Sequence, residues 1–222
     1  MEILGQMARV PVTARQKFEE AAYFYNGMFA HRTNVVVFPY YLSGFLSALR
    51  SVTMYLQKQY THDERFAAWY PAKQSEMNAD PVLKNLNVKR VAVVHREPFD
   101  LYFRKGYKMP EKYGGSITTT HFELRDEVDP NGWIRMSIRV GADGEKEPVE
   151  PRISWHFSAD DPSDVMGYCH SGLQKLDSVL KELAELRLEM GLQVDEEISA
   201  SQGEDGVTGH ALSPRDSHAV SR

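Results

Sequence analysis

The sequence FPYYLSGFLSALRSVTMYLQKQY, residues 38–60, indicates the fold more strongly than any other part of this chain. Its large apolar residues recur at alternating steps of four and three: Phe38, Leu42, Phe45, Leu49, Val52 and Leu56. This period predicts a helix of about five turns that buries one face. Small residues lie beside that face: Ser43, Gly44, Ser47, Ala48 and Ser51. They favour close helix packing, either inside one bundle or between two copies of the chain.

Helices are also predicted on both sides of this segment. Thr13 and Gln16 have the spacing of a capping box, which predicts a helix over about 14–29. Asp63 can cap a third helix, which Pro71 bends or interrupts. The pair Asp80-Pro81 favours the start of a fourth helix, which runs to about residue 94 or 95. Residues 1–12 form a lead-in to this helical part, which covers residues 13–100.

The period changes after residue 115. Three segments are rich in β-branched and aromatic residues, and the turn sequences DPNG and GADG separate them: 117–125, 133–140 and 152–158. They predict a small antiparallel meander of three strands within residues 115–160. Three strands cannot bury both faces of a sheet, so one face is expected to pack on the helices.

The chain is predicted to end in a long helix and an acidic tail. Apolar residues at steps of three and four predict a helix over residues 163–191 that stops at Gly191 and packs on the earlier helices. Residues 192–222 contain six acids and two arginines, with few large apolar side chains, and are expected to be disordered. The expected fold class is therefore α+β.

Composition excludes several classes of protein. The chain has 222 residues, a net charge of −5 and one cysteine, so an internal disulfide and a thiolate zinc cluster are excluded. The first residues lack the apolar core of a secretory signal, and no apolar run reaches the roughly 20 residues that span a bilayer. We expect a cytoplasmic protein without a membrane partner.

Positive charge is concentrated in one region. Residues 80–115 carry eight Lys or Arg against four acids. Such a patch is either an RNA-binding surface or a solvated charged face.

Familiar catalytic motifs are missing from the sequence. There is no glycine-rich phosphate loop, no HExxH pair and no nucleophile elbow. The histidines lack metal-site spacing, and most are expected to be surface or hydrogen-bonded core residues, so we expect no metal and no cofactor. The exception is KRVAVVHREP, residues 89–98, in which four residues separate Arg90 from His95 just before a proline.

This segment resembles the HEPN superfamily, whose members carry an Arg, four to six residues and then a His near the end of a late helix. The long second helix, the aromatic segment FAAWY and the helix opened by Asp80-Pro81 extend the resemblance over roughly residues 12–100. It implies an antiparallel HEPN-like helical bundle. It also implies metal-independent RNA cleavage of toxin or defence type, at a site formed by two protomers of a homodimer.

The resemblance gives His95 and Arg90 the catalytic roles. A histidine can give or take a proton near neutral pH, and an arginine can hold the scissile phosphate. Arg96, Lys89 and Lys105 would contact RNA phosphates. A five-residue offset separates Arg90 and His95 by about 140° around an ideal helix. Either the last turn unwinds, or each helix contributes to a composite site with its dimer mate.

A structural role for the two residues is the alternative. Arg90 could cap the last carbonyls of its helix or pair with Glu97, and His95 would then favour the helix dipole. The protein would in that case be a non-catalytic module that dimerises or docks a partner, such as a nucleotidyltransferase-type antitoxin.

Overall fold

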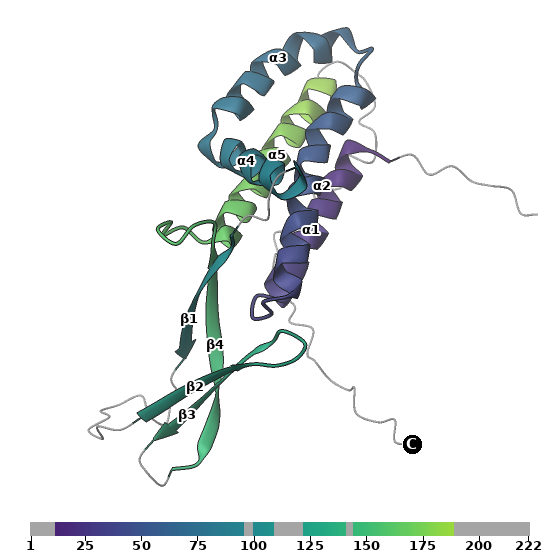
Figure 1. Cartoon of the computed structure of the whole chain (residues 1–222). Helices are drawn as coiled ribbons and strands as arrows, with labels where there is room; N and C mark the ends of the chain where they lie inside the picture. The colour runs from purple at the N-terminus through teal and green to yellow at the C-terminus, as the bar shows by residue number, and fades with distance from the viewer. Residues whose placement is uncertain (1–11, 96–99, 109–121, 141–143, 189–222) are drawn as a thin grey trace, which may run out of the picture.

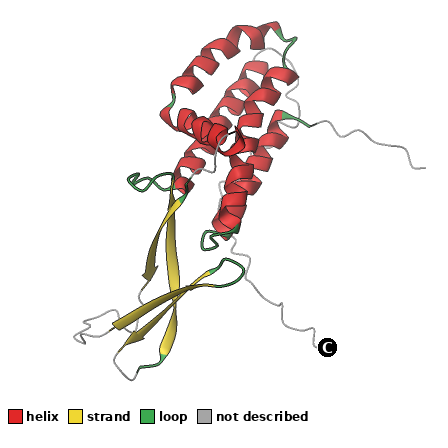
Figure 2. Ribbon diagram, in the orientation of Figure 1, coloured by secondary structure: helices red, strands yellow, loops and turns green. Residues whose placement is uncertain are grey.

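The computed structural model describes residues 12–95, 100–108, 122–140 and 144–188. These ranges hold five helices and four strands: α1 Ala14–Ala30, α2 Val37–Gln59, α3 Glu64–Ala79, α4 Pro81–His95, β1 Tyr102–Lys108, β2 Phe122–Val128, β3 Ile134–Val140, β4 Lys146–His156 and α5 Val165–Leu188. The molecule is elongated, with the helices at one end and the strands at the other (Figures 1 and 2). The predicted tail, 192–222, lies outside the described residues.

The predicted first and second helices are confirmed. Thr13 and Gln16 form a reciprocal capping box at the start of α1. All six residues of the predicted apolar face of α2 are buried. Two of the small residues beside that face pack against other parts of the same chain. Ala48 is buried, and a Cβ added to Gly44 would lie 2.6 Å from Cε1 of Phe24. Ser47 is exposed.

The third helix begins as predicted and continues through the proline. The Asp63 carboxylate accepts hydrogen bonds from the backbone N–H groups of Arg65 and Phe66. The helix α3 then runs through Pro71 to Ala79, so this proline does not interrupt it.

The expected HEPN-like helical bundle is wrong, because no such bundle is evident in the structure. The helices of the first hundred residues share their core with α5, which packs against α1, α2 and α4 from the far end of the sequence. The buried side of α5 contributes many of the core residues: Val165, Cys169, Leu173, Leu176, Val179, Leu180 and Leu183. The helical part is thus completed by the last helix.

The expected three-stranded meander is also wrong. The strands form an antiparallel half-barrel of four, in the order β1-β4-β3-β2. The strand that was not predicted is β1, with the sequence YFRKGYK. Four of its seven residues are charged or glycine, so the aromatic residues Phe103 and Tyr107 on one face do not form an obvious alternating pattern. It lies at the edge of the sheet, where charged side chains reach solvent and discourage pairing with another chain.

The long strand β4 changes partner along its length. Residues 146–149 pair with β3, whereas residues 150–156 pair with β1. Within the part of the sheet that the structure describes, each half therefore has one edge without a partner strand. A proline whose ring faces such an edge removes no sheet hydrogen bond. Pro148 and Pro151 both lie within β4, and their presence explains why the predicted strand began only at residue 152.

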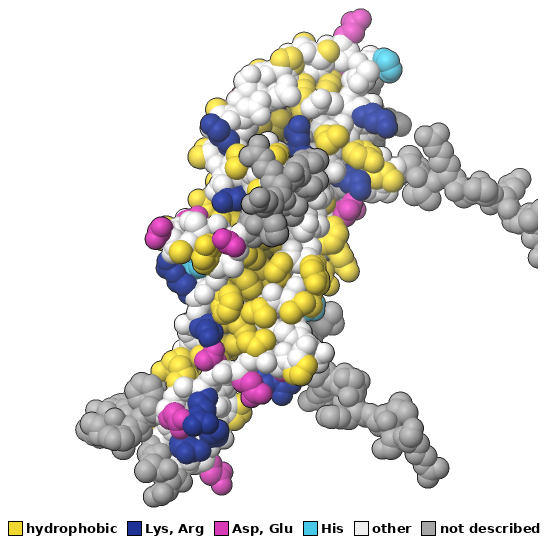
Figure 3. Space-filling view, in the orientation of Figure 1, with side chains coloured by type: hydrophobic (Ala, Val, Ile, Leu, Met, Phe, Trp, Pro, Cys, Tyr) yellow, Lys and Arg dark blue, Asp and Glu magenta, His cyan; other side chains and the backbone are white. Residues whose placement is uncertain are grey.

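The helices and the half-barrel meet in an apolar junction. The sheet has a small core of its own, formed by Ile134, Met136, Ile138 and Val149. Val35, Phe103 and Ile153 are partly buried and pack against both this core and the helical core. In the view of Figure 3, hydrophobic side chains gather on the surface between the helices and the strands.

Candidate functional site

The fourth helix carries the Arg-to-His motif, and its start is fixed by the predicted cap. The Asp80 carboxylate accepts hydrogen bonds from the backbone N–H groups of Val82 and Leu83, and Pro81 occupies the first helical position. The helix then continues to His95, as predicted.

Arg90 has a partly buried side chain on this helix. It makes no hydrogen bond or ion pair with any residue that the structure describes, and thus does not cap a carbonyl within α4. The alternative partner, Glu97, lies outside the described residues. A guanidinium without another partner can bind a phosphate bidentately, so its position is compatible with anion binding.

The backbone of α4 tests one of the two geometries left open for the motif, in which the last turn unwinds. The helix is regular through His95, so the last turn does not unwind before that residue. The backbone positions 90 and 95 therefore lie about 140° apart around the axis. One regular copy of α4 thus does not present both positions on one side.

Two of the predicted phosphate contacts, Lys89 and Lys105, lie on different elements, α4 and β1. The Lys89 ammonium lies 5.1 Å from the ring centroid of Phe157, in a cation–π contact. Lys105 pairs with Ile153 in the β1–β4 register, four residues from Phe157 or roughly 13 Å along the strand. Arg96 lies outside the described residues.

Lys105 forms a structural ion pair. Its ammonium binds the Asp126 carboxylate, which joins the edge strands β1 and β2 across the half-barrel. Both side chains stand on the face of the sheet that carries Met136 and Ile153, according to the register. The proposed role of Lys105 as an RNA contact would require this pair to open.

Two histidines in the described ranges, His156 and His31, have contacts that are typical of structural residues. His156 is buried, and its ring nitrogens lie 3.0 Å from the Ser163 carbonyl oxygen and 2.9 Å from Ser154 Oγ. His31 stacks on Tyr41 with ring centroids 5.0 Å apart. Within the described ranges, no group of three or more His, Cys, Asp or Glu side chains is placed to hold a metal ion.

A groove that sequence reasoning missed lies between α2, α3 and α4, over Leu176 of α5. Arg50 and Lys84 lie on it, although they are far apart in the sequence. Arg50 directly follows Leu49 of the apolar face predicted for α2, and this position was the available sequence signal. A wheel of one helix does not show which other helices stand beside it.

Comparisons with known proteins give no relative. No family model, no curated protein and no solved structure matches the chain. Of the helices in the described ranges, none is long and apolar enough to cross a membrane.

Proposed function

We propose that this protein is a metal-independent endoribonuclease that acts as a homodimer, with Arg90 of one copy and His95 of the other at each site. Arg90 would hold the scissile phosphate and stabilise the charge that develops on it. His95 would transfer a proton to or from the ribose hydroxyl or the leaving oxygen.

The observation that carries the proposal is the environment of Arg90. Its side chain is only partly covered and makes no hydrogen bond or ion pair with a described residue, so the guanidinium is available to a ligand. An incoming phosphate would be that ligand. The regular course of α4 to His95 favours a site shared by two copies over a site within one.

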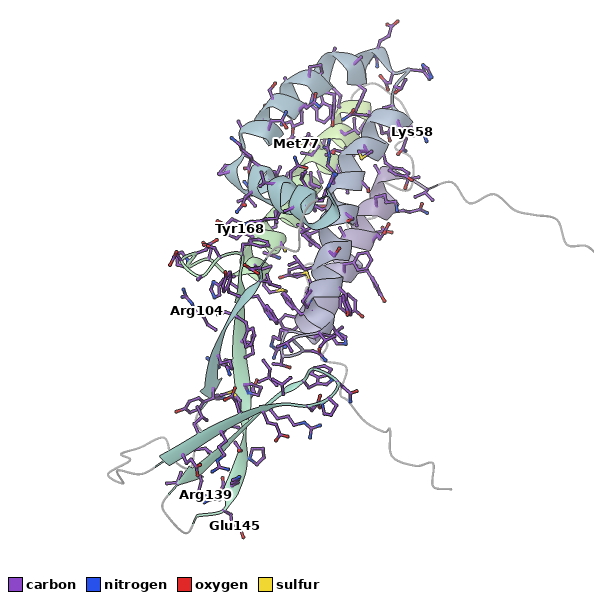
Figure 4. All side chains as sticks on the ribbon, in the orientation of Figure 1. Lys58, Met77, Arg104, Arg139, Glu145 and Tyr168 are labelled. Carbon is purple, nitrogen blue, oxygen red and sulfur yellow. The ribbon has the colours of Figure 1, made fainter. Side chains whose placement is uncertain are left out.

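The test is cleavage of a labelled mixed RNA pool in EDTA, with a sizing column beside it. The wild type is expected to be a dimer that cleaves, while Arg90→Ala and His95→Ala are expected to be inactive dimers. Lys58→Gln, a change at an exposed residue near the far end of α2, serves as the matched control (Figure 4). Inactive wild-type protein, or unchanged activity in His95→Ala, would refute the proposal.

Mixing the two inactive variants tests the shared site directly. After subunit exchange, half of the dimers pair one variant with the other, and each mixed dimer regains one of its two sites. Activity should therefore return to about one quarter of wild type. A site built within one copy would stay inactive in the mixture.

A non-catalytic interaction module is the second candidate, supported by exposed aromatic residues. Tyr23 of α1 and Tyr40 of α2 are 65% and 70% exposed. Phe24 links their surroundings, with ring centroids 5.7 Å from Tyr23 and 6.4 Å from Tyr41. Tyrosines of this kind are enriched at protein interfaces. If no sample cleaves RNA but Tyr40→Arg converts a wild-type dimer to monomer, this candidate replaces the nuclease.

A further inference from the structure

The groove between α2, α3 and α4 has an apolar floor and a polar rim. Its volume is about 160 Å³. Leucines from three helices form the buried floor: Leu46, Leu49, Leu86 and Leu176. The exposed rim carries Arg50, Gln74, Asn78, Lys84 and Asn87. Figure 4 labels Met77, another lining residue, in the middle of the helical part. Buried apolar walls with a few polar groups at the mouth are typical of ligand sites.

The charge of the groove favours an anion. Arg50 and Lys84 line it, and no carboxylate does. Neither cation forms an ion pair with a described residue. The carboxylate of Asp80, one helical turn before Lys84, is already bound by Lys175 at 2.6 Å and by two backbone N–H groups. Both cations are therefore available to a ligand.

Arg50 is also held in place. Its Nη1 donates a hydrogen bond of 2.9 Å to Thr53 Oγ1, which itself donates to the Arg50 carbonyl oxygen. Thr53 is buried and lines the groove. A guanidinium that is oriented before binding loses less freedom when it meets a planar or tetrahedral anion.

The neutral rim residues can recognise a heterocycle. Gln74, Asn78 and Asn87 are exposed, and their side chains make no hydrogen bond with any described residue. Each amide offers both donors and an acceptor, as the edge of a nucleobase does. An engineered cavity of about 150 Å³ holds a single benzene. One six-membered ring therefore fits this groove.

We propose that the groove binds a pyrimidine nucleotide. The ring lies on the leucine floor, the amides bind its polar edge, and Arg50 and Lys84 hold the phosphate. The nucleotide is either free or part of an RNA strand, since both present the same groups. The site uses neither Arg90 nor His95 and does not depend on the proposed nuclease activity.

Calorimetric titration of the full chain with uridine monophosphate, uridine and inorganic phosphate tests this inference. Uridine monophosphate should bind at least about tenfold more tightly than uridine or phosphate, because only it engages both the floor and the cations. Lys84→Gln and Arg50→Gln should each raise its Kd about tenfold. Lys58→Gln, outside the groove, should leave the Kd unchanged. Thermal melting shows which variants are folded, and Lys84→Gln changes an exposed side chain without removing a described contact.

Three outcomes would overturn the proposal: no binding of uridine monophosphate at millimolar concentration, phosphate binding as tightly as the nucleotide, or an unchanged Kd in folded Lys84→Gln.

A 5′-phosphorylated oligouridylate distinguishes a free nucleotide from an RNA strand as the source of the ligand. Tighter binding of the oligonucleotide than of the monophosphate identifies an RNA strand, and binding of the monophosphate alone identifies a free nucleotide. RNA cleavage lost in Arg90→Ala, with nucleotide affinity kept, would separate the two sites.

Discussion

Phe38 and Trp155 stack face to face, with ring centroids 4.3 Å apart and ring planes 4° apart. Phe38 belongs to α2 and Trp155 to β4, and both are almost completely buried. The Trp155 Nε1–H also donates a hydrogen bond of 2.8 Å to the Arg32 carbonyl oxygen, in the segment before α2. This aromatic pair is thus a direct packing contact between the helical part and the half-barrel.

Removing the Phe38 ring should loosen this junction. We expect Phe38→Ala to lower the free energy of unfolding by about 3–5 kcal/mol, because it removes buried area and leaves a cavity against Trp155. Urea unfolding measures the change. Met54→Ala, at a position of the same helix that is 55% exposed, is the control and should change stability by less than about 0.5 kcal/mol. Equal effects of the two variants would contradict the assigned junction.

Asn34 joins the start of α2 to the turn between β2 and β3. The residue is buried, its Oδ1 accepts from the backbone N–H groups of Val36 and Val37, and its Nδ2 donates to the Asn131 carbonyl oxygen. Asn34→Ala should cost about 2–3 kcal/mol, because these groups lose their partners. Asn34→Asp retains the acceptor and should recover part of the loss. Denaturant unfolding of both variants checks this order.

Two helical glycines should respond in opposite ways to alanine. A Cβ at Gly27 would lie 2.2 Å from Cε1 of Tyr41, whereas nothing lies within 4 Å of a Cβ at Gly167. Gly167→Ala should therefore stabilise the protein by up to about 1 kcal/mol through helix propensity. Gly27→Ala should destabilise it, because α1 and α2 must separate or the Tyr41 ring must move. Unfolding curves that shift in the same direction would contradict the close approach at Gly27.

Asp80 should make stability depend on pH. Burial alone would raise the pKa of Asp80, but hydrogen bonds from Lys175 and from the N–H groups of Leu83 and Val82 outweigh it and lower the pKa. A lowered folded pKa stabilises the folded state above the unfolded pKa of about 3.9, and this contribution disappears as pH falls through the folded value.

Asp80→Asn isolates that charge, because asparagine can still cap the helix. At neutral pH we expect the variant to be less stable by under about 1 kcal/mol, since the pair with Lys175 is partly exposed. Urea unfolding at several pH values should show the two proteins converging as pH falls below the unfolded pKa of about 3.9 and through the lower folded value. A constant difference across this range would rule out the charge as its cause.

Cys169 should be inert in the folded protein. Burial raises the pKa of its thiol well above the usual value, and the charge of Asp164 raises it further. Because the thiolate is the reactive form, a thiol reagent should modify Cys169 only when the helical core opens. Modification should accelerate in denaturant, in step with loss of helical circular dichroism.

The helices could be predicted from sequence because each had a local signal. The α2 seam and the caps at Thr13, Asp63 and Asp80 depend on residues within one or two turns of each other. The edge strand β1 carries charge and Gly106, which hid its alternation. How Arg50 and Lys84 come to line one groove depends on the packing of whole helices, and no local pattern contains that information.

The candidate residues divide in the same way. The position of Arg90 on a late helix follows from the cap at Asp80 and the length of α4. The separation of Lys105 from Lys89 does not follow from any local signal. It depends on the pairing of β1 with β4 and on an ion pair with Asp126. Adjacency in a basic stretch of sequence was therefore a poor measure of adjacency in space.

The change of partner within β4 divides the half-barrel into two ladders with different supports. The pairing of β4 with β1 includes Trp155, which packs on the helical part. The pairing of β4 with β3 belongs to the hairpin that has its own small core. The backbone amides of the two ladders should consequently exchange with deuterium at different rates. The turn of the β2–β3 hairpin is itself tied to the start of α2 through Asn34, so exchange within the hairpin should be slowest near that turn and faster toward its other end.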